Sequence, residues 1–417
     1  MKSALLCLTL AAAVAGIPPA LADDWPQHRG LQRHGIADEA GLSSDWEQSP
    51  PREVWRRPIG IGYSAVTIAD GRVFTMSLDG EEEVVVALDP DSGQTLWRVA
   101  LGPSKASDMD DSGPRTTPTV HDGVVYTASS ASRLVALDAE DGSLLWENTL
   151  VDAEQVPRFG YSVSPLVDGE LVVVETGGSE EAPGAVALDR QTGEVVWTAL
   201  AGPAGYGSPI VAELHGQRQY IFFRRVGAEV VSLSTEGEVL WRHETTGLSI
   251  ITTPIFLAPD RIFVATADDA FGGLMLEISH SEGTWAAGEV WKERLMRNHF
   301  NTAVHVAGHL YGFDNGTFRC LDAATGEKRW AKRGLGKGSL VASGSLLYVL
   351  ADDGSLLLVE ASPEGFNELG RVQAMSGRAW TAPSLANGRI YMRDFDEVVA
   401  YDLTDSGGVV ASEGDDS

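Results

Sequence analysis

Residues 187–197 spell Ala-Leu-Asp-Arg-Gln-Thr-Gly-Glu-Val-Val-Trp, and close copies of this block stand at 87–97 and 136–146. With the looser copies included, the block ends at Trp97, Trp146, Trp197, Trp241, Trp291 and Trp330. These tryptophans lie 39 to 51 residues apart. That interval is the length of one four-stranded propeller blade, so the repeat predicts an all-β propeller.

A second pattern precedes each block: a Ser/Thr-Pro step, an apolar alternation, an Asp-Gly or Asn-Gly pair, and another alternation. The clearest copy runs from Thr117-Pro118 through Asp122-Gly123 to Tyr126. Asp-Gly between alternating apolar residues is a strong hairpin signal. Proline is tolerated at the first residue of a strand. Together, the pattern and the block predict four antiparallel strands per unit.

The number of units predicts eight blades. Units begin near Val66, Pro118, Pro165, Pro209, Pro254, Ala303, Ser339 and Pro383. The unit at 339–372 has no tryptophan, so seven blades is the alternative. The last unit ends near Leu403 before any tryptophan strand, and a short strand carrying Trp55 stands before the first unit. We expect the Trp55 strand to complete the last blade, because closure removes the open sheet edges.

Each residue type in the block has a structural role. The Asp can start a turn by bonding its own backbone, and the Gly permits a positive φ there. The tryptophan is predicted to pack adjacent blades together, with its indole N–H on a partner. We assign this docking role to Trp55 and to the six block tryptophans. Cys320 fills the small first position of its block and is predicted to be buried.

The chain ends predict export. Residues 1–22 have the charge, apolar run and Ala20-Leu-Ala22 site of a signal peptide, so we expect a periplasmic or secreted protein. We expect an N-terminal extension at 23–51, the propeller at 52–403 and a disordered acidic tail at 404–417. No other segment is apolar enough to predict a membrane span. The mature chain would hold one cysteine, which excludes an intramolecular disulfide.

The formal net charge of the chain is −28. Such a surface repels other polyanions, which argues against nucleic acid and anionic membrane as partners.

The block and the head Asp24-Trp-Pro-Gln-His-Arg-Gly30 resemble those of pyrroloquinoline quinone (PQQ)-like repeat propellers, often described as BamB-like. The resemblance covers nearly the whole mature chain and implies the fold. It also implies two kinds of function. Quinoprotein alcohol dehydrogenases of this superfamily bind PQQ and calcium, whereas BamB-type propellers bind no cofactor and act as scaffolds in outer-membrane protein assembly.

The chain departs from the dehydrogenase pattern. It lacks the adjacent cysteine pair that faces the quinone, and we match no calcium-ligand set or catalytic Asp to its residues. From BamB it departs in having no N-terminal lipid-anchor cysteine. We therefore favour an exported non-enzymatic binding or scaffolding propeller without a cofactor, whose partner is an envelope protein or polymer. The alternatives are a small PQQ- and calcium-dependent oxidoreductase and a carbohydrate-binding propeller.

A ligand site is expected at the funnel mouth, where the inner strands converge. Residues just before the inner strands define a candidate ring made up of Tyr63, Arg115, Tyr161, Tyr206, Phe300, Lys337, Arg378 and Trp380, with Ile251 at the same level. Arg158 and Arg297 also precede inner strands. Aromatic rings and cations together predict a planar or anionic ligand. The alternative is that these side chains only fill the channel.

Other constellations predict no site. His299, His305 and His309 are close in sequence, but His305 and His309 straddle a predicted hairpin turn, which argues against zinc. We interpret Asp108-Met-Asp110-Asp111 as a solvated acidic loop and not as a calcium loop, because its spacing fits no known one. No nucleophile elbow or phosphate-binding glycine loop occurs.

Overall fold

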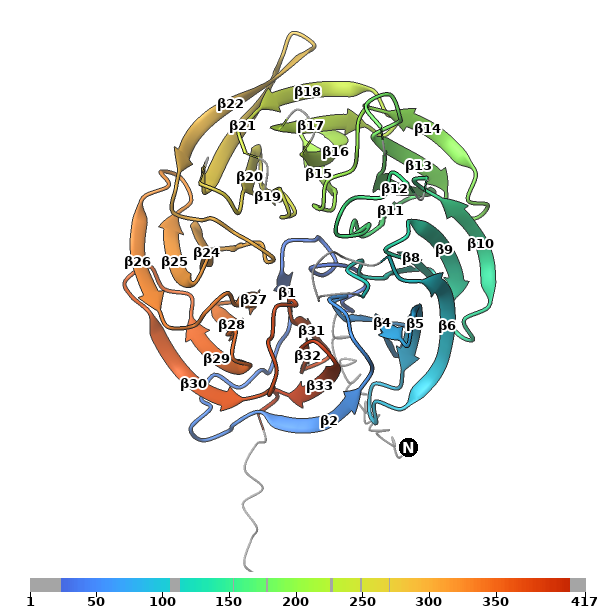
Figure 1. Cartoon of the computed structure of the whole chain (residues 1–417). Helices are drawn as coiled ribbons and strands as arrows, with labels where there is room; N and C mark the ends of the chain where they lie inside the picture. The colour runs from blue at the N-terminus through green and yellow to red at the C-terminus, as the bar shows by residue number, and fades with distance from the viewer. Residues whose placement is uncertain are drawn as a thin grey trace, which may run out of the picture.

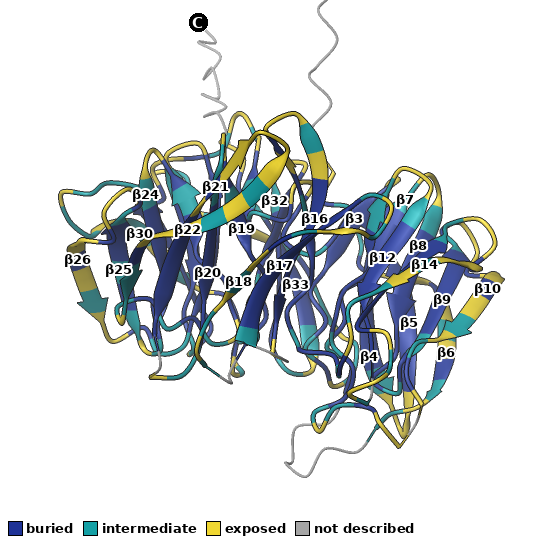
Figure 2. Cartoon of the chain, turned by 90° about the horizontal axis from the view of Figure 1, so that it is seen from above, coloured by how far each residue is buried: buried dark blue, intermediate teal, exposed yellow. Residues whose placement is uncertain are grey.

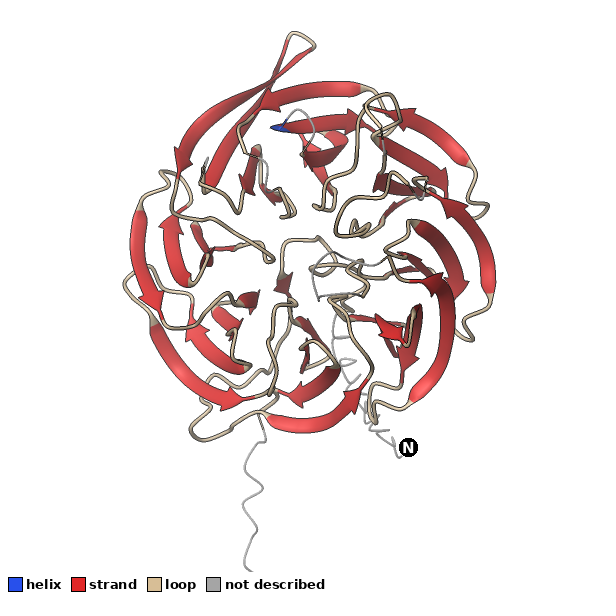
Figure 3. Ribbon diagram, in the orientation of Figure 1, coloured by secondary structure: helices blue, strands red, loops and turns tan. Residues whose placement is uncertain are grey.

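The computed structural model describes residues 24–105, 113–152, 154–177, 179–225, 228–247, 250–269 and 271–405. These residues form eight sheets arranged around a central axis (Figure 1). Loops and turns join nearly all of the strands (Figure 3). The predicted eight-bladed propeller is confirmed. In the described ranges, no helix is both long and apolar enough to cross a bilayer. The predicted signal peptide and nearly all of the predicted acidic tail lie outside these ranges.

Blades 1 to 3 each consist of four consecutive strands, with the innermost first. Blade 1 holds β3 (Thr67–Ala69), β4 (Arg72–Asp79), β5 (Glu82–Leu88) and β6 (Thr95–Pro103). Blade 2 holds β7 (Thr119–His121), β8 (Val124–Ala128), β9 (Arg133–Asp138) and β10 (Leu144–Thr149). Blade 3 holds β11 (Leu166–Asp168), β12 (Leu171–Glu175), β13 (Ala185–Asp189) and β14 (Val195–Ala199).

Blades 4 to 6 follow the same order. Blade 4 holds β15 (Ile210–Leu214), β16 (Gln217–Arg224), β17 (Glu229–Ser234) and β18 (Val239–Glu244). Blade 5 holds β19 (Ile255–Leu257), β20 (Arg261–Ala265), β21 (Gly273–Ser281) and β22 (Thr284–Glu293). Blade 6 holds β23 (Val304–Val306), β24 (His309–Asp314), β25 (Thr317–Asp322) and β26 (Lys328–Arg333).

The last two blades recruit strands from the N-terminal part of the chain. Blade 7 holds β27 (Ser339–Ser343), β28 (Leu346–Leu350), β29 (Ser355–Glu360) and β30 (Asn367–Gln373), and β1 (Ile36–Ala37) runs parallel to β27 at its inner edge. Blade 8 holds β31 (Ser384–Ala386), β32 (Arg389–Arg393), β33 (Glu397–Asp402) and β2 (Arg52–Pro58).

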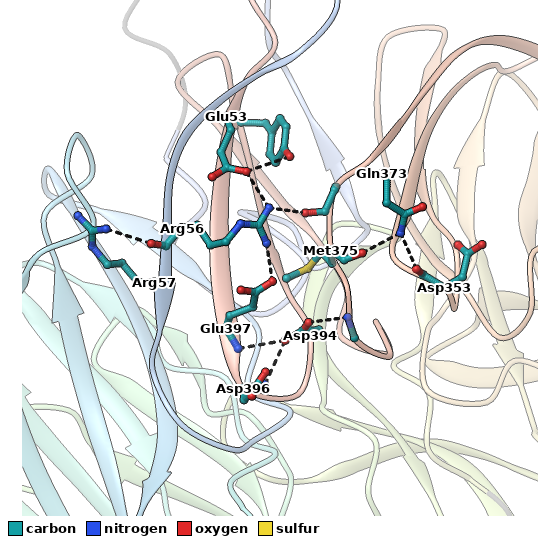
Figure 4. A network of polar contacts seen from close by, with 12 residues as sticks. Glu53, Arg56, Arg57, Asp353, Gln373, Met375, Asp394, Asp396 and Glu397 are labelled. Atoms are coloured by element: carbon teal, nitrogen blue, oxygen red, sulfur yellow. Dashed lines mark hydrogen bonds and ion pairs between the residues drawn. The ribbon is translucent and has the colours of Figure 1, made fainter.

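The ring closes as predicted. Strand β2 is the outermost strand of blade 8 and pairs antiparallel with β33, with Trp55 opposite Ala400. Figure 4 shows how Arg56 holds this strand: its guanidinium bonds Glu53 on its own strand, Glu397 on β33 and the carbonyl oxygen of Ala374. Since closure joins the two ends of the chain, it removes the open edges of a linear array.

Burial falls from the second and third strands of each blade to its outer strand (Figure 2). Strand β17 is buried along its whole length, whereas β10 buries only its tryptophan. A register shift of one residue, a β-bulge, interrupts the pairing of every outer strand at about the position of the block tryptophan. In blade 3 both residues before Trp197 therefore face solvent, with Val195 53 % and Val196 55 % exposed.

Most docking tryptophans join neighbouring blades, as predicted. The indole N–H of Trp146 in blade 2 donates to the carbonyl oxygen of Arg190 in blade 3 at 2.9 Å. A side-chain Cβ built on Gly193 would lie 2.6 Å from the Trp146 ring, so the glycine of the block permits the contact. Equivalent bonds of 2.7 to 3.1 Å run from Trp55 to Pro90, Trp97 to Ala139, Trp197 to Thr235, Trp291 to Ala323 and Trp330 to Ser362.

Trp241 is the exception. Its N–H donates to Oε1 of Gln219 within its own blade at 2.9 Å. The difference follows from the longer β21–β22 hairpin of blade 5, which projects from the rim in Figure 1. Trp285 near the tip of this hairpin stacks on His280 at 4.2 Å between ring centroids.

Blade 7 borrows its tryptophan from the N-terminal part of the chain. Trp46 lies 6.2 Å from Tyr348 on the second strand, between ring centroids. Trp146 lies in the same way at 5.9 Å from Tyr126 in blade 2. A Cβ on Gly370 would approach the Cβ of Trp46 to 2.4 Å, so the blade leaves room for this ring. The tryptophan that the unit 339–372 lacks is thus supplied from outside the repeat. This explains why the unit forms a complete blade and why the propeller has eight blades and not seven.

The Ser/Thr-Pro steps tie the inner strands together. The backbone N–H of Thr117 donates to Oγ of Ser164 at 3.0 Å, and that of Ser164 donates to Oγ of Ser208 at 2.9 Å. Near the axis each inner strand belongs to a different sheet, so side-chain hydroxyls replace the missing ladder bonds. Sequence reasoning explained only the proline of this step.

Residues 25–37 cross the central channel and form what we call the plug. The backbone N–H of Trp25 donates to the carbonyl oxygen of Ile68 in blade 1 at 2.8 Å, and the N–H of Ile68 donates to the carbonyl oxygen of Trp25 at 3.0 Å. Arg33 donates to the carbonyl oxygens of Ser164 (3.2 Å), Pro165 and Pro209, while Arg29 donates to those of Thr302 (2.9 Å) and Ala303 (2.7 Å). The plug therefore binds blades on opposite sides of the axis, with β1 on blade 7 as a further contact.

Candidate functional site

A cavity of about 820 Å³ opens at the end of the channel where the blade-linking loops enter the inner strands. We call it the cup. His28 and Arg29 of the plug lie among its lining residues and form its floor. Hydroxyls of the Ser/Thr-Pro steps, such as Thr117 and Ser164, line its wall. Its size falls in the usual range for small-molecule pockets.

The structure brings the predicted ring together with one exception. Tyr63, Arg115, Tyr206, Phe300, Lys337, Arg378 and Trp380 all line the cup, as do Ile251 and Arg158. Their role in binding a ligand stays a prediction.

Two predicted positions lie elsewhere. Tyr161 is buried inside the blade, and its hydroxyl donates to the carbonyl oxygen of Glu175 at 2.7 Å. It follows a turn at Gly160, where φ is +81°, and packs with Val163 in the core of blades 2 and 3. Arg297 is not among the lining residues, and its guanidinium bonds Asp314 at 2.7 Å and Asp269 at 2.5 Å.

Several lining residues were not foreseen. Arg225 comes from the loop between β16 and β17, which sequence reasoning did not place at the mouth. Phe159 and His299 are each adjacent in sequence to a predicted residue. They were missed because the predicted register of these loops was wrong by one residue. His28 belongs to the segment 24–30. The resemblance of this segment to the opening of similar repeat proteins was the only sequence feature that pointed to His28.

The cations of the cup rest on aromatic rings. The Arg378 guanidinium carbon lies 3.9 Å from the centroid of the Trp380 ring, and Trp380 is stacked on Phe300 at 4.5 Å and 24°. The Lys337 ammonium lies 5.8 Å from Phe300 and 6.0 Å from Trp380. The Trp380 N–H donates to Oδ1 of Asp352 at 2.5 Å, which fixes the plane of the ring. Attraction between a cation and the ring face favours this geometry.

A second set repeats the arrangement in other loops around the cup. Arg115 lies over Tyr63 at 5.1 Å, and Arg158 lies over Phe159 at 5.2 Å. Phe159 in turn contacts Tyr206, with 6.0 Å between ring centroids. The rings are supports for cations in both sets.

The charge of the cup is positive. Its described lining includes Arg29, Arg115, Arg158, Arg225, Lys337 and Arg378, and neither Asp nor Glu occurs among those residues. Burial and the charges of Arg29 and Arg33 lower the pKa of His28 to about 3. Burial and Lys337 lower the pKa of His299 to about 4. Both histidines are therefore neutral at pH 7, and the cup suits anions.

The residues of the cup do not fit calcium with a quinone. Calcium prefers several carboxylate and carbonyl oxygens, whereas the described lining is cationic. The only cysteine of the described chain, Cys320, is buried in blade 6, and burial raises the pKa of its thiol to about 11. Arg378 and Phe300 both lie against the ring of Trp380, so this ring has little face left for a planar cofactor.

The three histidines do not converge. His299 lines the cup, while His305 lies beside the plug at a smaller cavity, formed partly by turns that follow the inner strands. His309 contacts the carbonyl oxygen of Ala307 at 3.0 Å. Within the described ranges no group of three His, Cys, Asp or Glu side chains could hold a metal ion. The loop Asp108-Met-Asp110-Asp111 lies outside the described residues.

Eight four-stranded blades, docking tryptophans and a funnel at the axis define the class of the chain, a propeller of PQQ-like repeats. A family model described as outer membrane protein assembly factor BamB matches residues 81–332, which is more than half of the chain. The chain belongs to this BamB family, and it is a BamB-like propeller.

BamB proteins and quinoprotein dehydrogenases differ in how much of this chain they match. BamB of Yersinia pestis is 22 % identical over 390 residues, spanning 87 % of this chain and 92 % of that protein. A 1-butanol dehydrogenase (cytochrome c) of Thauera butanivorans is 32 % identical, but over only 151 residues, which are 34 % of this chain and 19 % of that enzyme.

A solved structure shows that the fold is shared beyond the BamB family. The quinohemoprotein alcohol dehydrogenase of Comamonas testosteroni superposes with a TM-score of 0.67 at 13 % identity, covering 91 % of this chain and 80 % of that one. At this identity the likeness concerns the fold alone, because one fold carries many functions.

Proposed function

We propose that this chain is an exported, non-enzymatic binding and scaffolding propeller of the cell envelope, whose partner is an envelope protein or polymer. The observation that carries the proposal is the sequence similarity to an outer membrane protein assembly factor over 87 % of the chain. The dehydrogenase similarity covers about a third of the chain.

The rim of the propeller supports the proposal. Outer strands expose backbone groups on which an extended segment can add as another strand. On blades 2 and 3 the bulge before each tryptophan also presents an apolar pair, Leu144 with Leu145 and Val195 with Val196, each residue 49 to 55 % exposed. Blade 6 instead carries Lys328 and Arg329 at the same position, so the rim is not uniform.

The alternative is a small PQQ-dependent oxidoreductase. The local similarity to a 1-butanol dehydrogenase and the axial cup favour it. The cationic lining and the covered ring of Trp380 argue against it, because the described lining holds no carboxylate for calcium and this ring has little free face. Incubation of the purified protein with PQQ and calcium, followed by visible spectra and dye-linked alcohol oxidation, tests this alternative directly. A bound quinone with turnover would establish it.

The scaffold proposal is tested by crosslinking and pull-down from envelope extract of the native host. We expect a specific envelope component with the wild-type chain and its loss in the variant Leu145→Lys/Val196→Lys. The matched control is Lys328→Glu, which changes the same bulge position on blade 6 and should retain the component. The proposal fails if the wild type recovers nothing above a tag-only control, or if the rim variant retains everything.

A further inference from the structure

We propose that the cup is a binding site for a compact, non-aromatic oxyanion that carries several carboxylate or phosphate groups. The inference rests on the cup alone, and it holds whether or not the rim binds an envelope partner.

The first support is the reversal of charge. The chain carries a formal net charge of −28, yet the described lining of the cup holds six cationic side chains and no acidic one. Lys337 and Arg225 reach it from opposite parts of the chain, before blade 7 and within blade 4. A concave site lined by one sign of charge raises the local concentration of the opposite ion.

The second support is the charge below the floor. Arg29 and Arg33 are 4 % and 1 % exposed. Their hydrogen bonds within the described chain go to backbone carbonyls, to Oε1 of Gln27 and to the hydroxyl of Thr119, and none of these bonds reaches a carboxylate. Buried charges in proteins are usually paired with opposite charge. An anion held on the floor would compensate these two guanidinium groups.

The third support distinguishes an anion from a planar ligand. Arg378 and Phe300 both contact the ring of Trp380 at short range. Tyr63 and Phe159 each carry an arginine as well. These contacts orient the cations and occupy ring faces of Trp380, Tyr63 and Phe159 on which a planar ligand would otherwise stack. The sequence alone predicted a planar or an anionic ligand, and the arrangement favours the second.

The size and shape of the cup exclude a threaded polymer. Its volume is about 820 Å³, and the plug closes its floor. The site therefore suits a compact ligand that enters from one side, in the range typical of small-molecule pockets.

Isothermal titration calorimetry with the mature chain tests the proposal at low ionic strength. The probes are citrate for carboxylates, tripolyphosphate for phosphates, PQQ as a planar anion, and a hexaglutamate peptide. We expect citrate or tripolyphosphate to bind at one site per chain, and which of the two binds more tightly assigns the anionic group. Lys337→Gln and Arg225→Gln should each weaken binding about tenfold, as the loss of one charge-assisted bond predicts. The control Lys328→Gln on the rim should not change it.

An NMR titration supplies a readout at the site itself. The His299 pKa is held near 4 partly by Lys337, so a saturating anion should raise it by about one unit. The proposal is overturned if neither small anion binds, if PQQ or the peptide binds while they do not, or if the His299 pKa is unchanged at saturation. Binding that survives both Lys337→Gln and Arg225→Gln places the anion elsewhere and also overturns it. Circular dichroism of each variant confirms that it folds.

Discussion

The contact between the block glycine and the docking tryptophan can be tested by adding a single methyl group. Gly193 has a φ of +72°, and a Cβ there would lie 2.6 Å from Cε3 of Trp146 in the preceding blade. Gly169 in the same blade has a similar φ of +57°, but a Cβ there would meet nothing within 4 Å. Gly169→Ala is therefore a matched control for Gly193→Ala.

The expected magnitudes follow from these contacts. Both alanines carry the strain of a left-handed conformation, about 1–2 kcal/mol, partly offset by about 0.4–1 kcal/mol from the stiffer unfolded chain. Gly169→Ala should therefore lower the free energy of unfolding by about 1 kcal/mol. Gly193→Ala must also displace the Trp146 ring, which weakens the 2.9 Å bond to Arg190 and the packing around it. These losses add about 2 kcal/mol, for a total near 3 kcal/mol.

Urea unfolding followed by far-UV circular dichroism measures both changes without depending on tryptophan emission. The double variant Trp146→Ala/Gly193→Ala isolates the contact, because the methyl group then meets an empty space. We expect its cost in that background to fall to the value of Gly169→Ala, which is a coupling energy of about 2 kcal/mol. Equal costs for Gly193→Ala and Gly169→Ala in the wild-type background would refute the docking role.

Two further predictions concern the plug. The His28 pKa of about 3 lies below the ordinary 6.5, so between these pH values only the unfolded chain takes up the proton and stability falls as pH falls. His28→Gln should reduce the loss of unfolding free energy by up to about 1.4 kcal/mol per pH unit between pH 6.5 and 4. Urea unfolding at a series of pH values measures this dependence. An unchanged dependence on pH would contradict the prediction. Arg33→Met leaves carbonyls of blades 3 and 4 unpaired and should cost about 3 kcal/mol. It should also open residues 24–37 to proteolysis, whereas equal cleavage in the wild type would show that the plug is not held by Arg33.

Local chemistry made the architecture predictable. The Asp, Gly and Trp of each block act within one turn or on the next blade, so their spacing predicts the blades wherever the block recurs. The closing role of Trp55 was predictable in the same way, because the last unit lacked its outer strand and a strand carrying Trp55 stood unassigned before the first unit. The unit without a tryptophan left seven or eight blades open.

The cup was predictable only in part. The level of each residue before its inner strand follows from the repeat, and this placed Trp380 and Arg378 correctly. Loops vary by a residue or two, however, so the repeat cannot say whether a side chain faces the axis or the blade. For this reason the repeat did not predict that Tyr161 is buried in the core or that Arg297 bonds Asp314. Arg225 reached the cup from a loop that lies outside the pattern.

By itself, the sequence determined the class of fold, the four-stranded repeat unit and most of the docking tryptophans, because strands, turns and tryptophan packing recur at similar intervals. Only the tertiary structure decided that Trp46 completes blade 7, that Arg29 and Arg33 plug the channel, and that cations from separate loops meet over it. Those contacts join residues far apart in the chain and occur once each. No periodic signal can encode them, and they exist only after the ring has closed.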